Sequence, residues 1–177
     1  MKKLFYLFGC ACAFVVIASS CNDESSGSPT GDTIPDGPVT VADSDVSGCG
    51  GFEPEKRGGY AENDANEKLS WTFNSRSGTL EIIHSGLILN CCGVHTIDAS
   101  FENGVLTIFE DDQPEPVGGR CRCICSFDFA VTLTGMKSGP ISVLIRLRVD
   151  DDTTEHWNGT IDLGEGSGVI LLSDSPE

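Results

Sequence analysis

The chain has 177 residues, enough for one domain of ordinary size, and 27 acidic residues against 11 basic ones give it a formal net charge of −16. A surface of this sign repels phosphate backbones, which excludes nucleic acid as a partner and leaves proteins, glycans and cations.

The first 20 residues have the composition of a cleavable signal peptide. Lys2 and Lys3 form a positive start, and residues 4–18 carry no charge. An uncharged run of this kind matches the apolar core of a signal peptide and is short of the roughly 20 residues that span a membrane. We therefore expect export of the chain and removal of residues 1–20.

The stretch Ala18-Ser19-Ser20-Cys21 resembles the lipobox of bacterial lipoproteins, in which signal peptidase II cuts just before the cysteine. The resemblance implies that Cys21 becomes the lipidated first residue and that its acyl chains, palmitate among them, hold the protein on the cell envelope. More than one chain anchors a soluble domain, since each buried CH₂ contributes about 0.8 kcal/mol. The acidic run Asn22-Asp23-Glu24-Ser25 resembles the export tags of surface lipoproteins. An ordinary secretory signal, cleaved nearby, is the alternative.

Residues 21–47 are predicted to be the lipidated cysteine followed by a flexible acidic tether. Ser, Gly, Pro, Thr and Asp dominate this segment, and its carboxylates are unopposed by any Lys or Arg. Such a composition cannot bury enough apolar surface to offset the cost of ordering the chain. The short apolar run at residues 38–42 is the alternative, as a first strand, so the boundary with the domain at residues 48–177 is soft.

Residues 48–177 are predicted to be all-β. Apolar and polar residues alternate along several short segments, as in strands with one buried face. These segments are residues 69–73, 79–89 with a break or bulge at Gly86, 121–134, 141–149, 155–163 and 169–172. About seven or eight strands separated by Gly, Asn and Pro turns predict an antiparallel β-sandwich or partly closed barrel.

A β-hairpin gives the clearest local signal. Residues 94–102 and 105–110 alternate in polarity and flank the dipeptide Asn103-Gly104. Both residues tolerate positive φ, which a type I′ turn requires, and the twist of that turn matches the twist of the strands.

The alternation is most regular over residues 121–134. The odd positions are all apolar or cysteine: Cys121, Cys123, Cys125, Phe127, Phe129, Val131 and Leu133. The even positions are largely polar, so the three cysteines are expected to continue the apolar face and to point into one end of the core.

An even set of cysteines lies beyond Cys21: Cys49, Cys91, Cys92, Cys121, Cys123 and Cys125. In an exported domain such a set predicts disulfides that staple the fold. Strand neighbours two residues apart have Cα atoms about 6.6 Å from each other, near the outer limit for a disulfide. Each cysteine of residues 121–125 is therefore expected to pair with Cys49, Cys91 or Cys92, in an order that stays open, and a turn at Cys92-Gly93 is needed.

The motifs Asn90-Cys91-Cys92, the hairpin to Glu110 and Cys121-x-Cys-x-Cys-x-Phe127-Asp128 look like a group of uncharacterised cysteine-rich lipoproteins from Bacteroidetes-type and related Gram-negative bacteria. The resemblance covers residues 90–149. It implies an envelope location, with the outer membrane expected, and no known activity.

A metal-binding or thiol-redox lipoprotein is the rival hypothesis. Thiolates of Cys121, Cys123 and Cys125, joined by His95 or His84, are ligands that zinc or copper(I) accepts. The C-x-C-x-C spacing differs from that of zinc knuckles, and thiolates belong to reducing compartments, so disulfides and no metal or other cofactor are the favoured expectation.

The acidic clusters are expected to be solvated turns. Asp111-Asp112 and Asp150-Asp151-Asp152 lie where loops are predicted, and the second run lacks the calcium-loop pattern at Thr154 and Glu155.

Catalysis has no support in the motifs. His84, His95 and His156 form no H-E-x-x-H pair, and no G-x-S-x-G elbow is present. Trp71 and Trp157 are expected to pack, and His156-Trp157 beside Asn158-Gly159 suggests a strand that meets a turn. The sequence therefore predicts a non-catalytic envelope module that binds a protein or glycan or has a structural role, with no enzyme activity.

Overall fold

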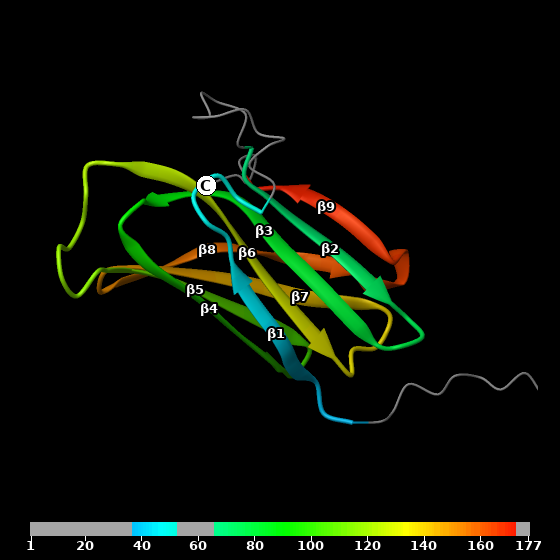
Figure 1. The fold of residues 1–177 in the computed structure, drawn as a ribbon. Helices are drawn as coiled ribbons and strands as arrows, with labels where there is room; N and C mark the ends of the chain where they lie inside the picture. Colours follow the sequence, from blue (N-terminus) through cyan, green and yellow to red (C-terminus); the bar gives the residue numbers. More distant parts are fainter. Residues whose placement is uncertain (1–36, 53–65, 173–177) are drawn as a thin grey trace, which may run out of the picture. The chain divides into compact units, whose positions relative to one another are not determined.

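The structure is a computed structural model that describes residues 37–52 and 66–172. In these ranges two β-sheets of nine strands face each other across one apolar core, without closing into a barrel (Figure 1). The prediction of a disulfide-stapled antiparallel sandwich is confirmed, with more strands than expected. The predicted signal peptide, Cys21 and the first part of the tether lie outside the described residues. No helix in the described ranges is long and apolar enough to cross a membrane.

The first sheet has five antiparallel strands. In spatial order they are β1 (Thr40–Val46), β6 (Ile124–Thr134), β3 (Thr79–Asn90), β2 (Lys68–Asn74) and β9 (Ser167–Leu171). The long β3–β6 pair forms its centre, and β1 and β9 are its edges.

The second sheet has four strands. In spatial order they are β4 (Gly93–Glu102), β5 (Val105–Pro114), β7 (Pro140–Val149) and β8 (Asp152–Asp162). The β5–β7 pair is parallel, because β6 crosses to the first sheet between them, and the other pairs are antiparallel. A single 3₁₀ turn, η2 (Leu163–Glu165), leads from β8 back to β9 in the first sheet.

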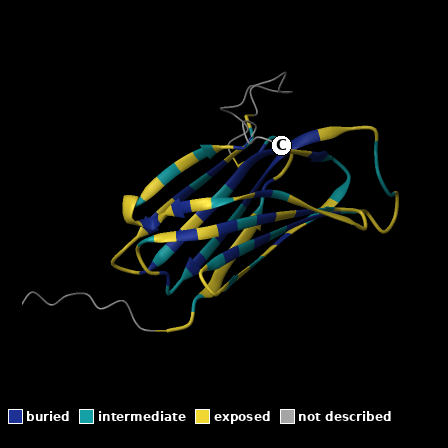
Figure 2. Cartoon of the chain, turned by 180° about the vertical axis from the view of Figure 1, so that it is seen from behind, coloured by how far each residue is buried: buried dark blue, intermediate teal, exposed yellow. Residues whose placement is uncertain are grey.

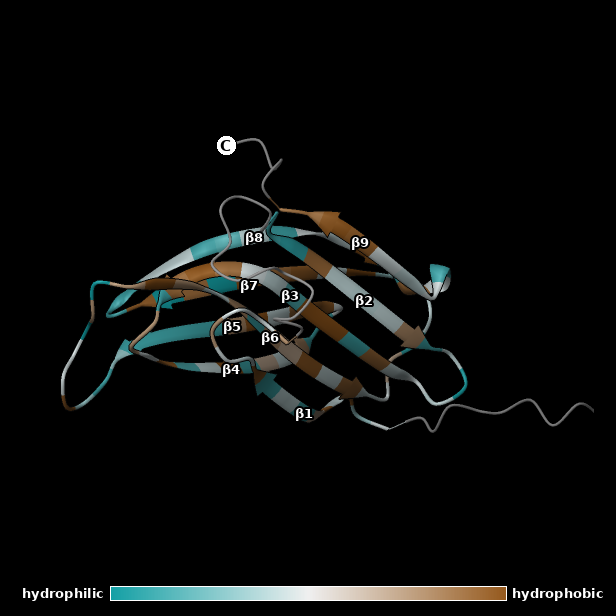
Figure 3. Cartoon of the chain, turned by 45° about the horizontal axis from the view of Figure 1, so that its top comes forward, coloured by the Kyte–Doolittle hydropathy of each residue, from teal (hydrophilic) through white to brown (hydrophobic). Residues whose placement is uncertain are grey.

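Alternating side chains from both sheets make the core. Burial alternates along β2 and β7, so buried and exposed bands succeed each other in Figure 2, and apolar and polar bands do so in Figure 3. The inner faces include Leu69, Trp71 and Phe73 of β2 and Ile141, Val143, Ile145 and Leu147 of β7. Each fully buried side chain of this size contributes about 1.5–3 kcal/mol to folding.

The predicted hairpin is confirmed as β4–β5. Asn103 has a φ of 53° and Gly104 a φ of 80°, and Glu102 pairs with Val105 across the turn. Both central residues thus have the positive φ of a type I′ turn.

Residues 40–46 form β1 at the edge of the first sheet, which agrees with the alternative of a first strand near residues 38–42 and not with a tether over these residues. Its residues pair with β6 from Thr40–Thr134 to Val46–Phe129, while all but Val46 are exposed. Backbone hydrogen bonds to a partner strand, rather than apolar burial, hold this polar segment in place. The domain therefore begins before residue 48.

The expected strand at residues 121–134 starts later than predicted. β6 begins at Ile124, so Cys121 and Cys123 lie in the preceding loop, half-buried and exposed, and only Cys125 belongs to the core. Disulfide bonds hold these two loop cysteines in place, so their regular spacing in the sequence does not reflect a strand.

The largely polar face of β6 is covered at its amino-terminal end. Ser126 and Asp128 are buried, because residues 47–52 run over them. The Asp128 carboxylate accepts hydrogen bonds of 3.0 Å from the backbone N–H groups of Phe52 and Gly86.

Asn158-Gly159 lies within β8 rather than in a turn, whereas the packing role expected of the two tryptophans is confirmed. Trp157 and Trp71 are buried, and each covers a glycine. A Cβ atom at Gly159 would lie 2.4 Å from the Trp157 ring, and one at Gly168 would lie 2.2 Å from the Trp71 ring. These two glycines make room for the indoles.

Candidate functional site: a disulfide cluster and a buried histidine–glutamate cluster

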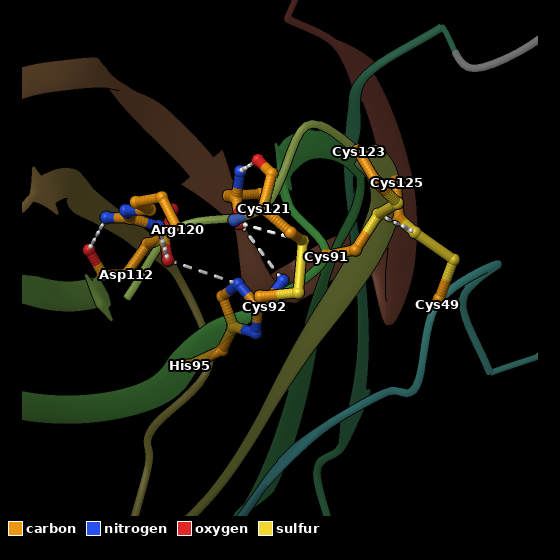
Figure 4. Close-up of a disulfide and its surroundings, with 10 residues drawn as sticks. Cys49, Cys91, Cys92, His95, Asp112, Arg120, Cys121, Cys123 and Cys125 are labelled. Atoms are coloured by element: carbon orange, nitrogen blue, oxygen red, sulfur yellow. Dashed lines mark hydrogen bonds and ion pairs between the residues drawn. A yellow bond between two sulfur atoms is a disulfide. The ribbon is translucent and has the colours of Figure 1, made fainter. Parts of the chain in front are cut away.

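Three disulfides gather at the end of the sandwich where β3 ends and β6 begins (Figure 4). The pairs are Cys49–Cys125, Cys91–Cys123 and Cys92–Cys121, with Cα–Cα distances of 5.4, 5.5 and 5.6 Å. The prediction that each cysteine of residues 121–125 bonds to a distant cysteine is confirmed. The turn or bulge expected at Cys92-Gly93 is a turn one residue earlier, at Cys91-Cys92, and it lets both cysteines reach the loop before β6.

Asn90 joins the turn at Cys91-Cys92 to the loop before β6. Its Nδ2 donates to the Cys121 carbonyl oxygen at 2.8 Å, and its Oδ1 accepts from the Cys92 N–H at 3.0 Å. Two disulfides also touch, since Cys91 Sγ lies 2.9 Å from Cys125 Sγ.

The structure does not assemble the thiolate metal site that was the rival hypothesis. The sulfurs of Cys121, Cys123 and Cys125 are all oxidised, so none of them is a thiolate ligand. His95 instead packs its ring against Phe127, with centroids 4.1 Å apart, and places Nε2 3.3 Å from Asp112 Oδ1 (Figure 4). Burial lowers the pKa of His95, and Arg120 adds to this effect against the opposing charge of Asp112.

The expectation of a solvated turn is wrong for Asp111-Asp112, which lies in β5 and is buried. Arg120, from the loop after β5, donates to the Asp112 carboxylate and carbonyl oxygen (Figure 4). It also donates to the Asp150 carboxylate in the β7–β8 turn. Arg148 of β7 holds the Asp111 carboxylate through two nitrogens. Cations from neighbouring segments thus make up for the desolvation of these carboxylates.

Gly93 leaves the space in which this network fits. A Cβ atom there would lie 2.0 Å from Asp112 Oδ1 and 2.7 Å from His95 Nε2.

A second cluster lies between the sheets and consists of Glu67, His84, Glu110 and His156. His84 comes from β3 and Glu110 from β5, so the two sheets meet here. Glu67 directly precedes β2, and His156 belongs to β8.

His84 is the centre of this histidine–glutamate cluster. Its Nδ1 lies 2.8 and 3.0 Å from the two carboxylate oxygens of Glu110, and its Nε2 lies 2.9 Å from Glu67 Oε1. The same Glu67 oxygen contacts His156 Nε2. Glu110 is 0% exposed and His84 1%, whereas the Glu67 and His156 side chains are each 23% exposed, so the cluster has a buried side and a solvent side.

Two β-bulges aim the histidines. His156 is the extra residue of β8, because Ile145 pairs with Trp157 while Arg146 pairs with Glu155. On β3 the extra residue is Gly86, with a φ of 87°, between the pairs of Ser85 and Leu87. An extra residue reverses the alternation of faces along a strand. On β8 this lets both His156 and its neighbour Trp157 face inward. On β3, His84 is the last inward residue before the reversal at Gly86.

The electrostatics tie the four groups together. Burial alone would lower the pKa of His84, but hydrogen bonds and charge interactions with Glu110 and Glu67 outweigh it and raise the pKa to about 9. Burial would raise the pKa of Glu67, but hydrogen bonds from His156 and His84 outweigh it and lower the pKa to about 2. In this cluster a proton on His84 therefore sits between two carboxylates at neutral pH.

From the sequence, His84 was expected only as an alternative ligand of the thiolate metal site and His156 only beside a strand that meets a turn, while Glu67 and Glu110 had no predicted role. A signal for Glu110 was present, because it continues the apolar alternation of Leu106 and Ile108. A carboxylate on a core face needs a partner of opposite charge. No comparable pattern marks Glu67.

Comparisons with protein-family models, with curated proteins and with solved structures found no match for this chain. Any functional assignment therefore depends on the chemistry of its own residues.

Proposed function

We propose that this protein is an exported lipoprotein, anchored to the cell envelope through Cys21, whose β-domain is a non-catalytic binding or structural module. The three disulfides carry the proposal, since disulfides of this number form and persist in oxidising compartments outside the cytosol. The signal-peptide and lipobox patterns of residues 1–21 support the same compartment and add the anchor.

The acidic character of the chain supports a protein or glycan as the partner. With a formal net charge of −16, the protein repels nucleic acid and anionic head groups, so its membrane contact is through the acyl chains. The outer membrane is the proposed location, on the resemblance of residues 90–149 to Gram-negative envelope lipoproteins.

Metabolic labelling with palmitate tests the anchor. Wild type should incorporate label and appear in the membrane fraction, whereas Cys21→Ala should lose both the label and cleavage by signal peptidase II. Cys12→Ala is the matched control, since it removes a cysteine from the same segment without touching the lipobox, and it should behave as wild type. Label retained in Cys21→Ala would refute the anchor.

Thiol counting tests the module against the thiol-redox alternative. The exported protein, denatured without reductant, should expose no alkylatable thiol among the six cysteines of the domain, and six after reduction. Peptide mapping should recover the cross-links of the structure. Free thiols at Cys121, Cys123 and Cys125 in freshly isolated protein would favour the redox function instead.

A further inference from the structure

We propose that Glu67, His84 and His156 form a binding site for one divalent zinc-type metal ion, with Glu110 as the outer carboxylate that orients His84. The site is separate from the disulfide cluster and from the predicted anchor, so it goes beyond the proposed function and does not depend on it.

The donor set is the first ground. The three groups offer ligand atoms that lie within 4.8 Å of one another. Zinc binds imidazole nitrogen and carboxylate oxygen at about 2.0–2.2 Å, which places tetrahedral donors about 3.3 Å apart. His84 Nε2 and Glu67 Oε1 are 2.9 Å apart, so small side-chain rotations would open enough room for the ion.

The orientation of the imidazoles is the second ground. Both Nε2 atoms point at the same oxygen, Glu67 Oε1, although the histidines come from different sheets. A histidine that served only to pair with Glu110 needs its Nδ1 alone. Two imidazole nitrogens thus meet at one carboxylate oxygen, and these are the three donors that a zinc-type ion would gather around itself.

The outer partner is the third ground. Glu110 contacts His84 Nδ1 with both oxygens, at 2.8 and 3.0 Å, from a fully buried position. Metal-binding histidines usually donate the ring N–H that faces away from the metal to a carboxylate, which fixes the tautomer and makes the other nitrogen a better ligand. Glu110 thus stands where such a partner is needed.

Charge balance is the fourth ground. Glu67 and Glu110 bring two negative charges into a poorly hydrated region, where unbalanced charge is costly. One divalent cation with two neutral histidines cancels both of them.

The bulges are the fifth ground. Bulges occur often beside functional sites, where they re-aim a side chain at the expense of a ladder hydrogen bond. Here two bulges on different sheets, at Gly86 and at His156, converge on one cluster. The Glu67 and His156 side chains remain 23% exposed, so the ion has an entry path and a fourth coordination position for water or a ligand.

Titration with Zn²⁺ tests the site. The protein, purified with its disulfides intact and stripped with a chelator, should bind one Zn²⁺ per chain in calorimetry and melt at a higher temperature when loaded. Glu67→Gln and His156→Gln should each weaken binding at least 100-fold. Glu110→Gln should weaken it about 10–100-fold, as expected for loss of an outer partner, without changing the stoichiometry.

Glu155→Gln is the matched control, because Glu155 is the exposed neighbour of His156 on β8, and it should bind Zn²⁺ as wild type does. The site is refuted if wild type shows no saturable binding of one ion, or if Glu67→Gln and His156→Gln bind as tightly as wild type.

NMR of the imidazole nitrogens keeps the proposal testable even where a variant fails to fold. The chain has only three histidines. Zn²⁺ should move the Nε2 signals of His84 and His156 in wild-type protein and leave His95 unchanged. A shift of His95 alone, or of no histidine, would overturn the assignment.

Discussion

The three disulfides should differ in what they contribute to stability, although their Cα–Cα distances are similar. Cys91–Cys123 and Cys92–Cys121 join almost the same two points of the chain, whereas Cys49–Cys125 ties down a separate segment. With Cys91–Cys123 intact, Cys49–Cys125 closes a loop of about 45 residues, for which chain entropy gives about 4 kcal/mol. Loss of the buried Cys125 sulfur adds about 1 kcal/mol.

The Cys92–Cys121 bond should contribute less than its sequence separation of 29 suggests. While Cys91–Cys123 remains, the additional ring contains only about 5 residues, and the same relation gives about 2 kcal/mol. We therefore predict that the double variant Cys49→Ala/Cys125→Ala loses about twice the stability that Cys92→Ala/Cys121→Ala loses.

Urea unfolding without reductant, followed by the fluorescence of the buried Trp71 and Trp157, measures both losses. The losses are large against the roughly 5–15 kcal/mol of a typical domain. Equal losses, or a larger loss for Cys92→Ala/Cys121→Ala, would refute the nested-loop reasoning.

Three further predictions use single substitutions. Gly93→Ala should destabilise the protein by about 1–3 kcal/mol, because its methyl group would collide with the buried carboxylate beside it, while Gly48→Ala, which has open space around it, should unfold in urea as wild type does. The hydrogen bond from Arg148 holds the pKa of Asp111 below its ordinary value, so the stability that ionised Asp111 contributes is complete above about pH 4. This contribution is lost as the pH falls through the lower pKa of the folded state. When the free energy of unfolding in urea is measured from about pH 2 to about pH 6, Asp111→Asn should therefore lose less stability at acid pH than wild type does. Gly104→Ala should cost about 1 kcal/mol in thermal melts, because the turn needs its φ of 80°, and an unchanged melting temperature would argue against the type I′ hairpin.

Alternation of apolar and polar residues predicts those strands whose own sequence carries the signal, whatever strand they pair with. β2, β7 and the β4–β5 hairpin are visible in the sequence because one face of each is apolar and the turn at Asn103-Gly104 has its own signature. β1 has no apolar face and is held through backbone bonds to β6, so the sequence indicated it only as an alternative strand at residues 38–42. The set of disulfide cysteines was predictable from composition, but their pairing required the turn at Cys91-Cys92.

The histidine–glutamate cluster could not be predicted from the sequence, because its residues come from distant segments and from both sheets. Glu67 and His156 are 89 residues apart, and His84 lies in the sheet opposite that of His156. Periodicity describes which residues share a face of one strand, not which faces meet. The bulge at His156 even reverses the predicted face, so that alternation from Trp157 would place the histidine outward.

The path of mechanical force through the domain depends on β1 and on the Cys49–Cys125 disulfide that follows it in the chain. A load applied to the amino-terminal side of Thr40 would first unzip β1 from β6, pair by pair, up to Val46. This frees a segment of about nine residues ahead of Cys49, which spans about 30 Å when pulled straight. The load then reaches the covalent Cys49–Cys125 link and enters β6, the neighbour of β1 in the first sheet, directly. β1 is thus a short segment that detaches at low force, and the Cys49–Cys125 disulfide limits how far it extends. Single-molecule pulling would show one small early step before the sheets unfold.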